Sequence, residues 1–346
     1  MSEARSEPQD PWREWRLPAL LFALTSASTL YAGARMQGGD SLLVGLPFAA
    51  PLMLILLAHE MGHYVAGRLH GVDASPPYFI PLPFGNIGTM GAIIQLRRPI
   101  TSRRALLDVG AAGPLAGMAV ALPVLIYGLA TSPVEPLPPG GGYLIEGRGL
   151  LYLGLLTWLH DIPEGSDVML NATAWAGWVG LLVTMINLLP IWQLDGGHVA
   201  YALRGPAQDR TTRWLLRALP LVAIGVGLGY ATPAYLQGAR GEALFTPLIA
   251  GANWWVWALV LTLLARRGTR RGPEEATRSR WRRGLDLILA RSEARHPPTD
   301  GAPLGPTRRA IGVFTLLLFV LLFMPSWLRY VPPQGPSPEA PAHTGR

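Results

Sequence analysis

The sequence predicts a polytopic α-helical membrane protein with about seven transmembrane helices and one re-entrant, partly β-structured loop. Half of the 346 residues are hydrophobic and only 15% are charged, whereas soluble domains carry about 25% charged residues. Cysteine is absent, which excludes disulfides, thiolate metal sites and cysteine nucleophiles. Most of the chain is therefore expected to lie in a bilayer.

Seven apolar runs are long enough to cross a bilayer, which takes about 20 residues of helix. Loops rich in glycine, proline or charge separate them. The runs cover residues 17–34, 42–67, 105–130, 169–190, 214–231, 246–265 and 311–328. A short amphipathic or re-entrant piece near 149–160 would add a dip on the outer face.

The arginines indicate how these spans are oriented. They gather at 97–104, 204–217 and 266–309, whereas loop 131–168 has one arginine against five acidic residues. Residues 266–310 alone carry twelve arginines against five acidic residues, a net of +7 that equals the charge of the whole chain. Because cytoplasmic loops are enriched in basic residues, this predicts cytoplasmic arginine-rich loops and no nucleic-acid partner. We expect a multi-pass protein of the bacterial inner membrane.

This plan divides the chain into five parts. We expect a cytoplasmic tail at 1–16, a membrane-embedded core at 17–265, a basic cytoplasmic loop at 266–310, a last transmembrane helix at 311–330 and a disordered tail at 331–346. The first part lacks the basic start and cleavage site of a signal peptide.

One apolar stretch, residues 78–98, does not fit a helix. It combines prolines, glycines and a β-branched run, a composition that favours a hairpin-like loop. Irregular backbone at membrane depth is tolerated where it is buried in protein or lines a wet cavity. We therefore predict a re-entrant loop with some β-structure, the alternative being an apolar cytoplasmic loop.

Three ionisable residues interrupt the second apolar run. His59, Glu60 and His63 lie in the segment LMLILLAHEMGHYVAGR, and ionisable groups at membrane depth indicate a functional site. Residues i and i+4 share one face of a helix, so both imidazoles can bind one tetrahedral metal ion. Glu60 would then be placed to take a proton from water. The alternative is that the histidines only form hydrogen bonds between helices.

A catalytic zinc site usually has three protein ligands and one open position. A metzincin would carry its third histidine six residues after the second, but Leu69 stands there and His70 comes one residue too late. We therefore assign His70 to the cytoplasmic edge of the span. Asp195 follows the end of the run 169–190, on the same predicted side as His63. This makes Asp195 the better third ligand.

Four motifs occur in order within residues 40–205. They are HEMGH at 59–63, PYFIPLPFGNIGTMGAIIQLR at 77–97, GAAGPLAG at 110–117 and NLLPIWQLDGGH at 187–198. Together they resemble the site-2 protease family of intramembrane zinc metalloproteases, of peptidase M50 type. The last three spans and the basic loop match nothing in this resemblance.

The resemblance implies one zinc ion per chain, bound by His59, His63 and Asp195, with Glu60 as general base. It implies hydrolysis of peptide bonds within or near transmembrane segments of membrane proteins, as in regulated intramembrane proteolysis. The implied partners are a transmembrane protein substrate, a membrane-anchored regulator and the lipid bilayer.

The same resemblance suggests how substrate would be held. Asn187 would be a polar contact near the reacting peptide, and Gly113-Pro114 would serve close helix packing. The loop 77–97 would guide the substrate. Independently of the resemblance, its β-branched run beside the active-site span predicts an edge that pairs with an unwinding substrate, with Ile93 and Ile94 as contacts.

Two other enzyme classes and one non-enzymatic class are the alternatives. A different membrane zincin would take its third ligand from a downstream glutamate, but Glu135, Glu146, Glu164 and Glu242 all fall in predicted outer loops. A membrane di-iron oxygenase needs several histidine clusters, and the chain has seven histidines with one pair at ligand spacing. A transporter or a metal-stabilised scaffold remains the non-enzymatic alternative.

Overall fold

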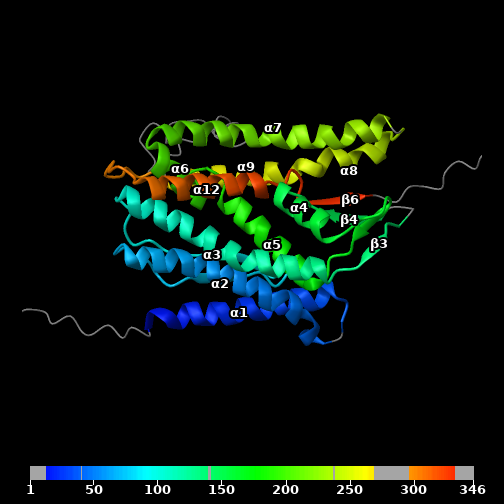
Figure 1. The fold of residues 1–346 in the computed structure, drawn as a ribbon, viewed down its shortest axis with the longest axis horizontal. Coiled ribbons are helices and arrows are strands. Elements are labelled where there is room, and N and C mark those ends of the chain that lie inside the picture. Colours follow the sequence, from blue (N-terminus) through cyan, green and yellow to red (C-terminus); the bar gives the residue numbers. More distant parts are fainter. Residues whose placement is uncertain (1–12, 40, 139–141, 237, 269–295, 332–346) are drawn as a thin grey trace, which may run out of the picture. The chain divides into compact units, whose positions relative to one another are not determined.

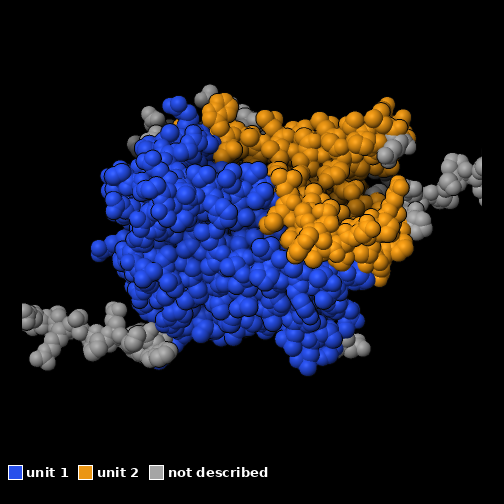
Figure 2. All heavy atoms as spheres, viewed as in Figure 1, with its two compact units in different colours: residues 1–133, 169–212, 294–322 blue, residues 134–168, 213–293, 323–346 orange. Residues whose placement is uncertain are grey.

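The computed structural model describes residues 13–39, 41–138, 142–236, 238–268 and 296–331. The chain forms two compact units, coloured separately in Figure 2. Unit 1 comprises residues 1–133, 169–212 and 294–322, and unit 2 comprises residues 134–168, 213–293 and 323–346. All four sequence motifs lie in unit 1.

Unit 1 is built mainly from helices. They are α1 (Arg13–Met36), the 3₁₀ helix η1 (Leu42–Gly45), α2 (Leu46–Leu69), α3 (Arg103–Ala130), α5 (Ala172–Asn187), α6 (Asp195–Arg204) and α12 (Pro306–Leu322), with the start of α7 (Ala207–Leu236). In Figure 1, α1, α2 and α3 run side by side, and α3 also packs against α5, α6 and α12. Small residues allow this approach, because a Cβ on Gly62 of α2 would come within 2.5 Å of the Ala112 carbonyl oxygen.

The predicted irregular loop contains an antiparallel hairpin. Strands β1 (Tyr78–Pro81) and β2 (Thr89–Ile93) pair Tyr78 with Ile93, with a register shift before Pro81. In the turn, Gly88 has φ +82° and its Cα faces the backbone of Thr29 in α1 closely enough to leave no room for a Cβ. The prediction of partial β-structure is confirmed, and re-entry of this loop into the membrane stays a prediction.

Unit 2 contains short strands and the remaining helices. They are β3 (Val134–Pro136), β4 (Tyr143–Glu146), α4 (Leu150–Leu159), β5 (Ser166–Val168), most of α7, η2 (Gly241–Leu244), α8 (Phe245–Leu248), η3 (Ile249–Gly251), α9 (Ala252–Gly268) and β6 (Leu328–Val331). Two antiparallel pairs form, β3 with β5 and β4 with β6. The buried Trp254 ring stacks on Phe323, and its indole nitrogen donates to the Pro325 carbonyl at 2.6 Å.

The helix lengths confirm a helical membrane protein but not the count of seven spans. Five described helical segments are long and apolar enough to cross a membrane: Glu14–Met36, Leu42–Leu69, Arg103–Ala130, Ala207–Leu236 and Phe245–Leu264. The expected spans at 169–190 and 311–328 correspond to α5 and α12, which have 16 and 17 residues. The piece near 149–160 forms the ten-residue helix α4.

The end of the chain differs from the expected last transmembrane helix at 311–330. Helix α12 begins earlier, at Pro306, and ends at Leu322, and strand β6 begins at Leu328. Pro325 accounts for the early end, because proline lacks a backbone N–H and disfavours helical backbone in the residue before it. Of the predicted tails and basic loop, residues 1–12, 269–295 and 332–346 lie outside the described part of the chain.

Candidate metal centre and active site

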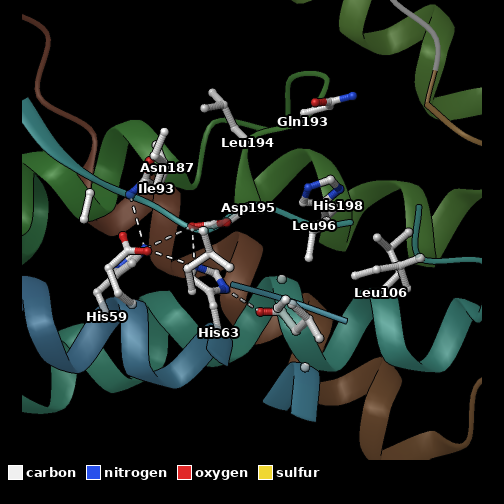
Figure 3. Close-up of a pocket in the computed structure, with 18 residues that line it drawn as sticks. His59, His63, Ile93, Leu96, Leu106, Asn187, Gln193, Leu194, Asp195 and His198 are labelled. Carbon is white, nitrogen blue, oxygen red and sulfur yellow. Dashed lines mark hydrogen bonds and ion pairs between the residues drawn. The ribbon is translucent and has the colours of Figure 1, made fainter. Parts of the chain in front are cut away.

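Three side chains from distant parts of unit 1 converge on one point (Figure 3). His59 Nε2 and His63 Nε2 lie 3.2 Å apart, and Asp195 Oδ2 lies 3.2 Å from each of them. The Asp195 side chain is 16% exposed to solvent, and the His59 side chain is 4% exposed. The structure therefore brings together the three residues that the sequence analysis assigned as metal ligands.

Local structure explains how α2 and α6 deliver these candidate ligands. His59 and His63 are one helical turn apart on α2, and Asp195 is the first residue of α6. Behind Asp195 the chain folds back closely, since a Cβ on Gly197 would come within 2.7 Å of the Ile191 carbonyl oxygen. The Asp-Gly-Gly sequence thus lets α6 begin directly beside the end of α5.

The donor set and its spacing fit a zinc ion. Two imidazoles and a carboxylate are ligands that zinc uses in catalytic sites, with bonds of about 2.0–2.2 Å. Ligand atoms around such a tetrahedral ion lie roughly 3.3–3.6 Å apart, close to the 3.2 Å observed here. The arrangement therefore suits one tetrahedral metal ion.

A backbone carbonyl orients one of the histidines. His63 Nδ1 donates to the Val109 carbonyl oxygen at 2.7 Å, which leaves Nε2 with a lone pair toward Asp195. Such a hydrogen bond on the far nitrogen fixes the tautomer of a metal-binding histidine. The role of Val109 could not be predicted from the sequence, because a main-chain contact leaves no trace in residue type.

The glycines of the GAAGPLAG motif make room for the two histidines. A Cβ on Gly113 would overlap the His63 ring, and one on Gly117 would lie 3.1 Å from His59 Cβ. The motif was expected to serve helix packing, and it does so at the position where α3 faces the histidines of α2.

A cavity of about 260 Å³ opens beside the three converging atoms. Glu60, Asn187, Ile93 and Ile94 line it, so all the predicted site residues meet at one place. Glu60 is buried, and the Asn187 side-chain nitrogen lies 3.3 Å from His59 Nε2. Ile93 is 53% exposed, in keeping with its place on the hairpin beside the opening.

His70 does not join the metal centre. It caps the C-terminus of α2, and its Nε2 lies 2.8 Å from Asp108 Oδ2, which Arg308 also contacts. His198, three residues after Asp195, does line the cavity. From the sequence, His198 was only the last residue of the motif at 187–198, without a predicted role.

The chain was compared with known proteins. Residues 47–226 match peptidase family M50. A "Probable zinc metalloprotease EGY2, chloroplastic" of Arabidopsis thaliana is 31% identical over 198 residues, which cover 55% of this chain and 34% of the relative. The protein of the same name from Oryza sativa subsp. indica is 34% identical over 158 residues, or 44% of this chain and 28% of the relative.

A "Probable zinc metalloprotease EGY1, chloroplastic" of Oryza sativa subsp. japonica is 34% identical over 190 residues, covering 52% of this chain and 31% of the relative. The chain thus spans about a third of the length of these curated relatives. Their names place them in chloroplasts, so they lend no support to the expected bacterial inner membrane. Because the family match covers more than half of the chain and includes all the converging residues, this chain belongs to peptidase family M50.

Proposed function

We propose that this protein is an intramembrane zinc metalloprotease that hydrolyses peptide bonds within or near transmembrane segments of membrane proteins. The observation that carries the proposal is the convergence of His59, His63 and Asp195 beside a cavity that also contains Glu60. Membership of a peptidase family supports it, as does the position of the histidine pair in the apolar span Leu42–Leu69.

We assign His59, His63 and Asp195 as the ligands of one zinc ion per chain. When bound, zinc would polarise a peptide carbonyl and lower the pKa of water toward about 7. Glu60 lines the same cavity and would act as general base, taking a proton from the attacking water and returning it to the leaving amine. The Asn187 amide, beside His59, would donate a hydrogen bond to the reacting peptide.

The hairpin β1–β2 is proposed as the element that receives the substrate. It is a two-stranded sheet, so within the described residues one edge of β2 pairs with no strand. Substrate helices hide their carbonyls in backbone hydrogen bonds and must unwind before hydrolysis. Pairing with β2 near Ile93 and Ile94 would hold an unwound segment over the cavity.

The proposed topology keeps seven crossings, with α5 and α12 as short spans. Helix α5 is largely buried, whereas α12 keeps an exposed apolar face. The support for this topology is the placement of the arginine-rich loops and of the acidic loop 131–168. In this topology the active site opens toward the cytoplasmic side. A membrane-anchored regulator and bilayer lipid would be its partners besides the substrate, in keeping with regulated intramembrane proteolysis.

The experiment that tests the function compares the wild-type protein with Glu60→Gln. Membranes that contain active protein should accumulate fragments of transmembrane proteins, detected by mass spectrometry, and the variant should not produce them. Purified Glu60→Gln should keep about one zinc ion per chain, since the base is removed and the ligands are not. Equal fragment patterns with both proteins would reject proteolysis and favour a metal-stabilised scaffold or transporter.

A further inference from the structure

A segment outside the family match supports the wall of the active-site cavity. The match ends at residue 226, yet residues 296–304 pack on α3, α6 and the start of α7 within unit 1. The His296 backbone nitrogen donates to Asp209 Oδ1 at 3.0 Å, and Asp300 Oδ1 accepts from the Arg103 backbone nitrogen at 3.0 Å. Leu304 is buried in a cluster that includes cavity-lining side chains.

The His296 side chain reaches His198 on α6. Its ring stacks on Tyr201, with ring centroids 4.1 Å apart and planes 23° apart. His296 Nε2 lies 2.8 Å from His198 Nδ1, and His296 Nδ1 lies 2.7 Å from the Pro297 carbonyl oxygen. Three polar groups therefore form one chain: the Pro297 carbonyl, His296 and His198.

The direction of the hydrogen bonds among these three groups follows from the Pro297 carbonyl. A carbonyl oxygen only accepts, so His296 Nδ1 must carry a proton and donate to Pro297. In a neutral imidazole the other nitrogen, here Nε2, is then an acceptor. His198 Nδ1 must donate to it, which leaves His198 Nε2 without a proton.

Both histidines are neutral near pH 7. Burial, reinforced by the neighbouring His296, lowers the pKa of His198 to about 4. Burial also lowers the pKa of His296. The assignment of one proton to each ring therefore holds at physiological pH.

His198 belongs to the cavity wall. Asp195 and His198 lie at positions i and i+3 on one face of α6, and both line the cavity (Figure 3). His198 Nε2 makes no hydrogen bond to any residue in the part of the chain that the structure describes. A backbone N–H is the donor that every peptide substrate carries, and an unwound segment exposes it.

Resting on the proposed proteolytic function, we propose that His198 Nε2 accepts a hydrogen bond from a backbone N–H of the bound substrate, and that His296 is the positioning residue that holds His198 in the required tautomer. His198 would thus bind the peptide as an acceptor, whereas Asn187 offers a donor on the same cavity. The segment 296–304 thereby becomes part of the substrate-binding apparatus.

Three variants separate this role from a structural one. His198→Asn keeps a polar group near the Nδ1 position and lacks the acceptor at Nε2. His198→Gln extends an amide oxygen toward the Nε2 position and needs no partner to fix a tautomer. His296→Phe keeps an aromatic ring against Tyr201 and removes the acceptor that orients His198.

The probes are a fluorogenic single-span peptide with a Gly-Pro helix break and a set of analogues, each with one non-scissile amide near the cleavage site replaced by an ester. His198→Asn and His296→Phe should each raise KM roughly tenfold, the usual effect of losing one hydrogen bond, with kcat changed much less. For the analogue with the ester at one particular position, the KM of the wild-type protein should rise by the same factor. The KM of His198→Asn should not rise further with that analogue.

The double variant supplies the decisive comparison. His198→Gln should retain most of the wild-type KM, and adding His296→Phe to it should have little further effect, because the introduced amide needs no orienting partner. If His296→Phe raised KM equally in the wild-type protein and in His198→Gln, His296 would have a merely structural role, and the inference would be overturned. Loss of zinc from His198→Asn, or no ester position that couples to His198, would also overturn it.

Failure of the proposed function gives a different result. In that case the wild-type protein would cleave none of these peptides, or would cleave them as well as Glu60→Gln does. Cleavage that depends on Glu60 but is indifferent to His198 and His296 rejects only the present inference.

Discussion

Each unit contains a buried cluster of ionisable residues, and the two clusters differ in how their charges are balanced. In unit 2, Arg148 Nε lies 3.0 Å from Glu146 Oε1 and the same guanidinium contacts Asp167. The Tyr152 hydroxyl donates to Glu146 at 3.0 Å. In unit 1, three ligand atoms face one another at 3.2 Å, and no arginine is among the described residues that line their cavity.

The comparison shows how a structural cluster can be told from a functional one. In the Glu146 cluster, donors and acceptors are matched, so the cluster needs no further group. Arg148 contacts both Glu146 in β4 and Asp167 in β5. In the His59 cluster, acceptors converge on one point, and no arginine stands among the described side chains around that cavity. Such an arrangement is stable only with a cation or proton among the ligand atoms, and it marks the site that binds a ligand.

The largest expected effect tests this difference directly. His59→Ala, His63→Ala and Asp195→Ala should each lower zinc affinity by more than about 100-fold, because a catalytic zinc site has only three protein ligands to lose. Zinc content of the purified variants, measured by mass spectrometry, checks this. Arg148→Met, which breaks the matched cluster, should retain full zinc content. An Asp195→Ala protein with one zinc per chain would remove Asp195 from the ligand set.

A smaller effect is expected from the helix that faces the histidines. Gly113→Ala places a methyl group where the His63 ring lies, so the ring must move and zinc affinity should fall about 10- to 100-fold, as for lost orienting contacts. Competition with a zinc chelator measures it.

Gly154→Ala is the matched control for that substitution. Gly154 lies in α4 with open space around the position of a Cβ, so alanine should leave zinc affinity unchanged. If the two variants bound zinc equally well, the close approach of α3 to His63 would not matter for the metal.

The smallest expected effect on the metal, and a clear effect on stability, belongs to Arg148. Removing one partner of a buried ion pair leaves an uncompensated charge. Because the Arg148 side chain is partly exposed, Arg148→Met should destabilise the protein by about 3 kcal/mol, the lower end of the usual range. Burial already raises the pKa of Glu146, and Arg148 opposes that rise. Thermal unfolding in detergent, followed by circular dichroism, measures the loss.

The same variant has a pH dependence of known sign. Without Arg148 the pKa of Glu146 should rise further, so the folded variant binds a proton at a higher pH than the unfolded chain does. A raised carboxyl pKa favours the fold at low pH and disfavours it as pH rises through that pKa. The difference in melting temperature from wild type should therefore be larger at pH 7.5 than at pH 5.

Arg240→Met controls for the loss of an arginine as such. Arg240 is exposed and contacts the Tyr235 ring and carbonyl, so its replacement should cost less than about 1 kcal/mol at either pH. Equal melting curves for Arg148→Met and wild type would mean that the Glu146 cluster contributes no stability.

Several features could be predicted because their physical cause is local. The spacing of His59 and His63 places both imidazoles on one helix face, and the prolines and glycines of residues 78–98 predict a hairpin instead of a helix. The apolar runs predicted a helical membrane protein because a bilayer requires about 20 apolar residues for each crossing.

Other features depended on packing between distant segments. Asp195 could be chosen from its motif, but only the fold shows it 3.2 Å from residues more than 130 positions earlier in the chain. Helices α5 and α12 are also shorter than the apolar runs in the sequence predicted.

The sequence by itself determined the class of protein, the paired histidines with the adjacent Glu60, and the hairpin, since each follows from periodicity or spacing within a few residues. Only the tertiary structure decided that the Val109 carbonyl orients His63, that Gly113 makes room for its ring and that His296 reaches His198. These contacts involve a backbone carbonyl, a glycine, which has no side chain, and two histidines that are 98 positions apart in the sequence. None of them has a local sequence pattern, because they arise only where helices pack.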